Sequence, residues 1–171
     1  PTRVENNTEL EYDRPNLAKV LQTNGYRTGF VGKSHLIEHT AARQPARWES
    51  YGLKSYNKKD DPRDQEMTDK MHHNHEHWKR SIARQGFDYV DGVYAANLRE
   101  LYNEKSDVHN VEWTTRAALN FIKSSEDTPF FLYYATTVPH GSSPWIEKAR
   151  PLSGSDNALK NGCLFHSVDV V

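Results

Sequence analysis

Residues 17–36 read LAKVLQTNGYRTGFVGKSHL, and the order of signals in this stretch decides the fold class. The composition and spacing predict a helix over residues 15–24, with Asp13 as its N-cap and Gly25 as its stop. The run over 27–31 then predicts a short strand that ends in a polar cluster. A helix, a glycine and a strand in this order form half of a βαβ unit. The helix is expected to present one apolar face, made of Leu17, Val20 and Leu21.

A second helix and strand are predicted further along the chain. Asn110 is the expected N-cap of a helix that reaches about Ser125. Residues 130–135 (FFLYYA) are continuously apolar, which indicates a strand covered on both faces. Two helix–strand pairs predict an α/β fold with two or three strands of a larger mixed sheet and flanking helices. The apolar face of the second helix is expected to hold Trp113, Ala117, Leu119, Phe121 and Ile122.

The chain between these two pairs is polar. Residues 41–84 are expected to form a surface insertion, in which 65–84 contain no Pro or Gly and suit a helix. Residues 86–92 (GFDYVDG) then predict a short strand or turn. The helix is expected to lie on the surface and to bury a thin stripe, made of Met67, Met71, Trp78 and Ile82.

Three chemically capable side chains follow the two strands of the helix–strand pairs. Lys33 and His35 come after the first strand, and His140 follows the second. Ligands of open α/β sheets bind beyond the carboxyl ends of the strands, so these residues are expected to converge. Residues two apart in an extended segment project on the same side, so Lys33 and His35 are expected to address one ligand. A lysine offers a fixed charge to an oxyanion, and a histidine moves a proton near neutral pH.

Composition excludes several functional classes. With 22 Lys and Arg against 23 Asp and Glu, the net charge of −1 argues against a basic surface for nucleic acid. No run approaches the roughly 18–20 apolar residues that a membrane span needs. Four Trp, nine Tyr and six Phe argue against a disordered chain. The single Cys excludes an internal disulfide framework and a four-cysteine zinc site.

Three segments together resemble the formylglycine-dependent sulfatases of the alkaline-phosphatase-like superfamily. Residues 17–36 are similar to their "L…GY.T...GK.H" segment, and 86–89 (GFDY) to the "GFD" segment that follows. Residues 118–141 are similar to "A..FI…PFFLY…PHGP". The order and rough spacing of the three match over most of residues 15–145. The resemblance implies a sulfuric ester hydrolase whose substrate is a sulfated small molecule or glycan.

The resemblance also implies a role for each candidate site residue. Lys33 would contact the sulfate and the formylglycine side chain. His35 would hydrogen-bond the formylglycine hydroxyl and help to eliminate sulfate, and His140 would contact the scissile sulfate and protonate the leaving alcohol. The family's calcium ion and its formylglycine are the implied cofactors, and an exported or lysosomal location is expected.

The departures from the family pattern are equally specific. The family's C-x-P-S-R type nucleophile motif does not occur, so residues 1–171 are expected to be a partial sulfatase catalytic domain that is inactive alone. Residues 146–171 match poorly. Asp156 and Asn157 resemble part of the "SDNG" calcium motif, but Ala158 replaces its glycine and the spacing is too short. Most or all calcium ligands are therefore expected to lie elsewhere.

Other interpretations remain open at this stage. A phosphodiester or phosphonate hydrolase of the same superfamily shares much of the expected sheet, and a truncated non-catalytic product would also carry these motifs. Residues 72–77 (HHNHEH) place histidines at i, i+3 and i, i+4. A solvated helix face is the favoured interpretation of that run, ahead of a metal site. Cys163 lacks the nucleophile context and is expected to be a buried structural thiol.

Overall fold

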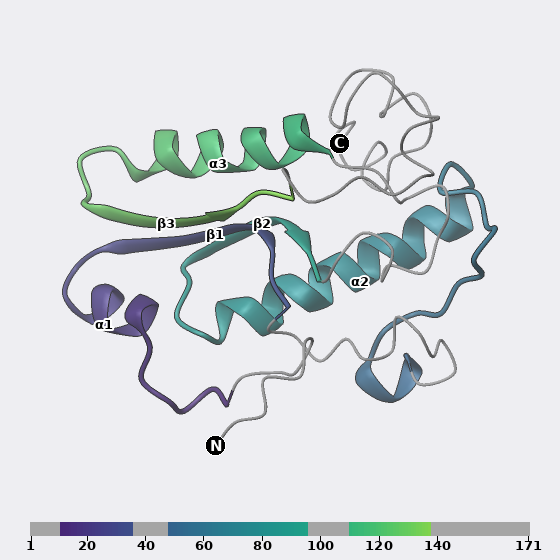
Figure 1. Ribbon diagram of the computed structural model, residues 1–171, viewed down its shortest axis with the longest axis horizontal. Helices are drawn as coiled ribbons and strands as arrows, with labels where there is room; N and C mark the ends of the chain where they lie inside the picture. Colours follow the sequence, from purple (N-terminus) through teal and green to yellow (C-terminus); the bar gives the residue numbers. More distant parts are fainter. Residues whose placement is uncertain (1–10, 36–47, 96–109, 138–171) are drawn as a thin grey trace.

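The computed structural model describes residues 11–35, 48–95 and 110–137. These ranges form three strands with helices on both sides (Figure 1). None of their helices is long and apolar enough to cross a membrane. In chain order the elements are α1 (Leu17–Thr23), β1 (Arg27–Lys33), the 3₁₀ turn η3 (Glu49–Tyr51), α2 (Gln65–Ala83), β2 (Tyr89–Tyr94), α3 (Val111–Ser125) and β3 (Phe130–Ala135).

The sheet has the order β2-β1-β3, and β1 pairs in parallel with both neighbours. Helix α3 covers one face, and α1 and α2 lie on the other (Figure 1). The α/β fold predicted from the two helix–strand pairs is therefore confirmed. Because all three strands are parallel, their carboxyl ends lie at the same edge of the sheet.

The N-cap of helix α1 lies three residues later than predicted, at Asn16. The side chain of Asn16, not Asp13, accepts a hydrogen bond from the Lys19 N–H at 3.0 Å. Only Ala18 is buried in this helix, whereas Leu17 and Val20 are 61 % and 51 % exposed. The expected apolar face therefore points largely to solvent in the described part of the chain.

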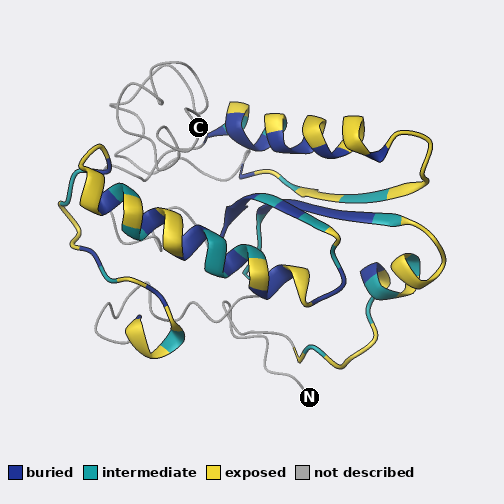
Figure 2. Cartoon of the chain, turned by 180° about the vertical axis from the view of Figure 1, so that it is seen from behind, coloured by how far each residue is buried: buried dark blue, intermediate teal, exposed yellow. Residues whose placement is uncertain are grey.

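Helix α2 is the crossover that returns the chain from β1 to β2, and its buried stripe faces the sheet (Figure 2). The four apolar residues predicted for the stripe are all buried. The segment before the helix packs into the same core, which differs from the surface insertion expected over 41–84. This core holds Phe30, Trp48, Leu53, Tyr56, Met67, Met71, Trp78, Ile82, Val93 and Tyr94.

Asp88, from the GFD segment, stabilises the start of β1 through hydrogen bonds. Its carboxylate accepts hydrogen bonds from the Thr28 N–H at 2.9 Å, from the Thr28 hydroxyl at 3.0 Å and from Gln22 at 2.5 Å. Burial, the largest single effect, raises the pKa of this carboxyl, but these hydrogen bonds and the charge of Arg27 together lower the pKa below its usual value. The aspartate therefore joins β1 to the turn before β2.

Strand β3 has the predicted bounds but not the predicted environment. Within the described residues it is an edge strand, paired only with β1. Phe130, Tyr133 and Tyr134 are 42 %, 51 % and 39 % exposed. On the side of α3, Phe130 packs edge-on against Phe121, with 5.6 Å between ring centroids. The expectation of a strand covered on both faces is thus wrong for the part of the chain that is described.

Candidate functional site

The candidate site lies at the carboxyl edge of the sheet, where β1 ends at Lys33. In the register of the sheet, Lys33 is paired with Tyr94 of β2, and the preceding Gly32 is paired with Ala135 of β3. Lys33 and His35 are both half-buried. Lys33, at the end of the central strand β1, therefore lies between the ends of β2 and β3, at the edge where α/β proteins bind ligands.

Gly32 makes this close arrangement possible. Its φ of 105° lies in the region that favours glycine. A Cβ atom at this position would collide with the backbone carbonyl oxygen of Ala135. Any larger residue would push β3 away, so the glycine sets how closely the end of β3 approaches Lys33. His140 follows five positions after Ala135 and lies outside the described residues.

A β-bulge in β2 sets the register beside the site. Val31 is paired with Asp91 and Gly32 with Val93, so Gly92 is the extra residue. Its φ is 60°, and a Cβ there would lie 3.3 Å from the Val31 side chain. Bulges redirect the strand that follows them. The bulge thus brings Tyr94 opposite Lys33.

The turn after β1 is held by the end of β2. The Ser34 N–H donates to the carbonyl of Tyr94 at 2.8 Å, and the His35 N–H donates to the carbonyl of Ala95 at 3.0 Å. His35 has a φ of 61°, which is uncommon for a residue with a Cβ atom. Since the chain leaves the extended conformation here, the alternation that predicts a shared side for Lys33 and His35 does not extend to His35.

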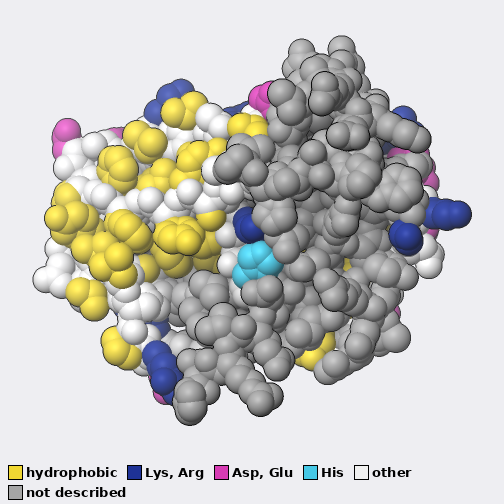
Figure 3. Space-filling model, in the orientation of Figure 1, with side chains coloured by type: hydrophobic (Ala, Val, Ile, Leu, Met, Phe, Trp, Pro, Cys, Tyr) yellow, Lys and Arg dark blue, Asp and Glu magenta, His cyan; other side chains and the backbone are white. Residues whose placement is uncertain are grey.

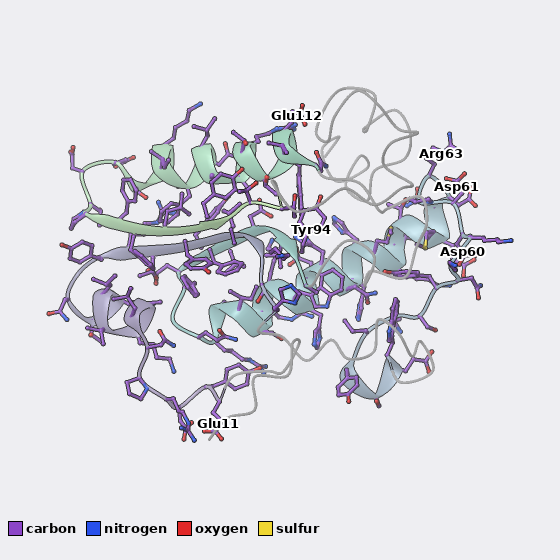
Figure 4. All side chains as sticks on the ribbon, in the orientation of Figure 1. Glu11, Asp60, Asp61, Arg63, Tyr94 and Glu112 are labelled. Atoms are coloured by element: carbon purple, nitrogen blue, oxygen red, sulfur yellow. The ribbon has the colours of Figure 1, made fainter. Side chains whose placement is uncertain are left out.

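The N-terminus of α3 reaches the same edge. The buried hydroxyl of Tyr94 accepts a hydrogen bond from the Asn110 N–H at 3.1 Å. Asn110 is the predicted N-cap, and its side-chain oxygen accepts from the Trp113 N–H at 3.3 Å. Figure 4 shows Tyr94 at the end of the sheet where Glu112 marks the start of α3. The positive end of the helix dipole therefore lies at the site's edge of the sheet.

The histidine run of α2 serves the fold. His73 Nε2 lies 2.8 Å from the carbonyl oxygen of Gly52. Asn74 is fully buried and bonds both backbone groups of Lys54, accepting at 2.7 Å and donating at 2.9 Å. His75 is also buried, and its Nε2 accepts from the Val93 N–H at 3.3 Å. The favoured interpretation of this run as a solvated face is therefore wrong for Asn74 and His75.

The described residues do not fit the family's calcium ion. Among them no group of three or more His, Cys, Asp or Glu side chains is arranged to hold a metal. Asp156, Asn157 and Cys163 lie outside the described residues, so their predicted roles stay predictions.

The sequence prediction missed Tyr94 as a member of the site's surroundings. The strand or turn predicted from the sequence ends at Gly92, because a glycine inside an apolar pattern is expected to mark a boundary. The glycine is instead the bulge, and the strand continues to Tyr94. The run after it, VYAA at 93–96, is the signal that could have extended the strand.

These features define an α/β protein with a lysine and a histidine at the carboxyl end of the central described strand. The profile of the Sulfatase family matches residues 2–158 of this chain. The chain therefore belongs to the sulfatase family. No curated protein matches the sequence.

Proposed function

We propose that this chain carries the sulfate-handling part of a sulfuric ester hydrolase. The observation that carries the proposal is the position of Lys33, at the carboxyl edge of the sheet and level with the end of β3. Family membership supports the choice of a sulfate ester as the substrate class.

The roles follow from the charges of a sulfate ester. The ester's oxygens are anionic, so the ammonium group of Lys33 would bind and orient them. Departure of the alcohol leaves charge on its oxygen, which a histidine can neutralise by donating a proton. His140 is assigned that donor role and His35 a role in releasing sulfate, both by resemblance. The nucleophile is assigned to a segment outside residues 1–171.

Sulfate titration of the ¹⁵N-labelled chain tests the anion-binding half of the proposal. Saturable shifts are expected at the amides of residues 33–35 and are expected to be lost in Lys33→Ala. Lys123→Ala is the matched control, because Lys123 lies in the last turn of α3, at the opposite edge of the sheet. Loss of the shifts in both variants, or in neither, would contradict the assignment of Lys33.

Two further measurements define the reaction. The chain alone is expected to leave an aryl sulfate unhydrolysed, and turnover by it would show that the nucleophile lies within residues 1–171. Titration with dimethyl phosphate, a phosphodiester with the same single negative charge as methyl sulfate, tests the alternative of a phosphodiester or phosphonate hydrolase. Tighter binding of the phosphate than of the matched methyl sulfate would favour that alternative.

A further inference from the structure

Tyr94 links three elements at the candidate site. Its backbone is level with Lys33, its carbonyl accepts from the Ser34 N–H at 2.8 Å, and its hydroxyl accepts from the Asn110 N–H at 3.1 Å. We propose that Tyr94 is a positioning residue, which holds the Lys33–His35 turn in its binding conformation. This inference rests on the proposed function of Lys33 and His35.

The turn requires support because of its backbone conformation. A left-handed residue other than glycine is strained, and such residues persist where the surroundings over-determine them. His35, with a φ of 61°, is held by the carbonyl of Ala95, the residue directly after Tyr94. The Ser34 amide is held by Tyr94 itself. The end of β2 thus supplies both backbone acceptors for the turn.

The side chain of Tyr94 fixes that end of β2. The residue is 0 % exposed, and its ring packs edge-on against Trp113 with 5.6 Å between centroids. The hydroxyl accepts a hydrogen bond from the backbone N–H of Asn110, and the side chain of Asn110 caps α3. The carbonyls of Tyr94 and Ala95 are therefore held in place by the first turn of α3, and the His35 turn is held in place by those carbonyls.

Tyr94→Phe removes the hydroxyl and keeps the ring. The buried backbone N–H of Asn110 then loses its hydrogen bond to the Tyr94 hydroxyl, and the contact between β2 and α3 at the site weakens. Tyr89→Phe is the matched control. Tyr89 lies at the other end of the same strand, and its hydroxyl donates to the Ala117 carbonyl of the same helix at 3.0 Å. Both variants lose one phenol hydrogen bond between β2 and α3, but only Tyr94→Phe loses it at the candidate site.

Amide hydrogen exchange and sulfate titration test the inference. In Tyr94→Phe the amides of Ser34 and His35 are expected to exchange about tenfold faster, which corresponds to the net worth of one hydrogen bond. Sulfate binding at residues 33–35 is expected to weaken several-fold. Tyr89→Phe is expected to leave both quantities unchanged, although urea unfolding of this variant should show a similar loss of global stability.

The outcomes separate this inference from the proposed function. Unchanged exchange at Ser34 and His35 in Tyr94→Phe, or equal acceleration in Tyr89→Phe, would overturn the positioning role. If the wild-type chain shows no saturable sulfate shift, the proposed function of Lys33 fails. The exchange comparison still decides in that case whether Tyr94 holds the turn.

Discussion

Acidification should destabilise this chain through one buried histidine, His75. The residue is 1 % exposed, lies against β2 through its bond from the Val93 N–H, and has its ring centroid 5.3 Å from that of Trp113. Burial, and then the charges of Lys79 and His72, lower its pKa from 6.5 to about 3. An accepting Nε2 requires the neutral ring, which agrees with the direction of this shift.

The sign and size of the effect follow from proton linkage. The folded-state pKa of His75 lies below the unfolded value of 6.5, so only the unfolded chain takes up this proton as the pH falls from 6.5 towards about 3. The stability it contributes is complete above 6.5 and decreases below that value. Each pH unit costs about 1.4 kcal/mol, so the free energy of unfolding should drop by about 2 kcal/mol at pH 5.

Urea unfolding followed by circular dichroism, at pH 7 and pH 5, measures this loss. His75→Gln keeps an acceptor for the Val93 amide and cannot titrate, so most of the pH dependence should disappear. His72→Gln is the control, because it removes an exposed histidine from the same helix. It removes only the smallest of the three effects on the pKa of His75, so most of the slope should remain. Burial also lowers the pKa of His77, so a smaller slope remains in every variant. An undiminished slope in His75→Gln would refute the reasoning.

Two stability predictions concern backbone contacts. Asn74→Ala should lower the free energy of unfolding by about 2 kcal/mol, because both backbone groups of Lys54 lose their side-chain partner. Urea unfolding measures this change, and a loss near zero would contradict a stabilising role for these two hydrogen bonds. Gly32→Ala should cost about 2–4 kcal/mol, because it adds a clash with Ala135 to the strain of a positive φ. Gly25→Ala isolates the strain, since its φ is 83° and nothing lies within 4 Å, so it should cost clearly less in the same assay.

Local signals predicted most of the elements correctly. Asn110 caps α3 as its side chain and position indicate, and the breaker-free run over 65–84 forms α2. These features depend on residues within a few positions of one another. The sequence predicts Asp13 as the cap of α1, whereas the structure has Asn16. Both are capping residue types near Pro15, and only the hydrogen bond from the Lys19 amide distinguishes them.

The burial of polar residues in α2 could not be predicted from such signals. Asn74 and His75 are stabilised by backbone groups of Lys54 and Val93, which lie 20 and 18 positions away in the sequence. A helical pattern shows which face is apolar, but it does not show that a distant segment will supply partners for polar groups on that face. The same reason explains Tyr94, whose partner Asn110 is 16 positions away.

Lys33 is predicted as a site residue because strand ends in α/β sheets follow a general rule, and the family resemblance implies its role. The strand order, with β1 between β2 and β3, places Lys33 at the edge of the sheet that the rule indicates. The predicted pairing of His35 with Lys33 requires an extended backbone as far as His35, but β1 ends at Lys33. The φ of 61° at His35 arises where Ala95 holds the turn, a contact across 60 positions of the chain.

The exposure of β3 in the structure differs from the burial on both faces that its apolar sequence predicts. Exposed edge strands are usually protected by charges, prolines or bulges, and β3 has six residues without a charge. Figure 3 shows an apolar surface on the left of the view, where β3 and α3 lie in Figure 1. The exposed large hydrophobic side chains include Phe130, Tyr133 and Tyr134 of β3 and Leu119 and Ile122 of α3. The composition of β3 is therefore that of a strand covered on both faces, whereas the described helices leave part of it exposed. The side chains of a strand project above and below the sheet, so their cover must come from elements packed on its faces.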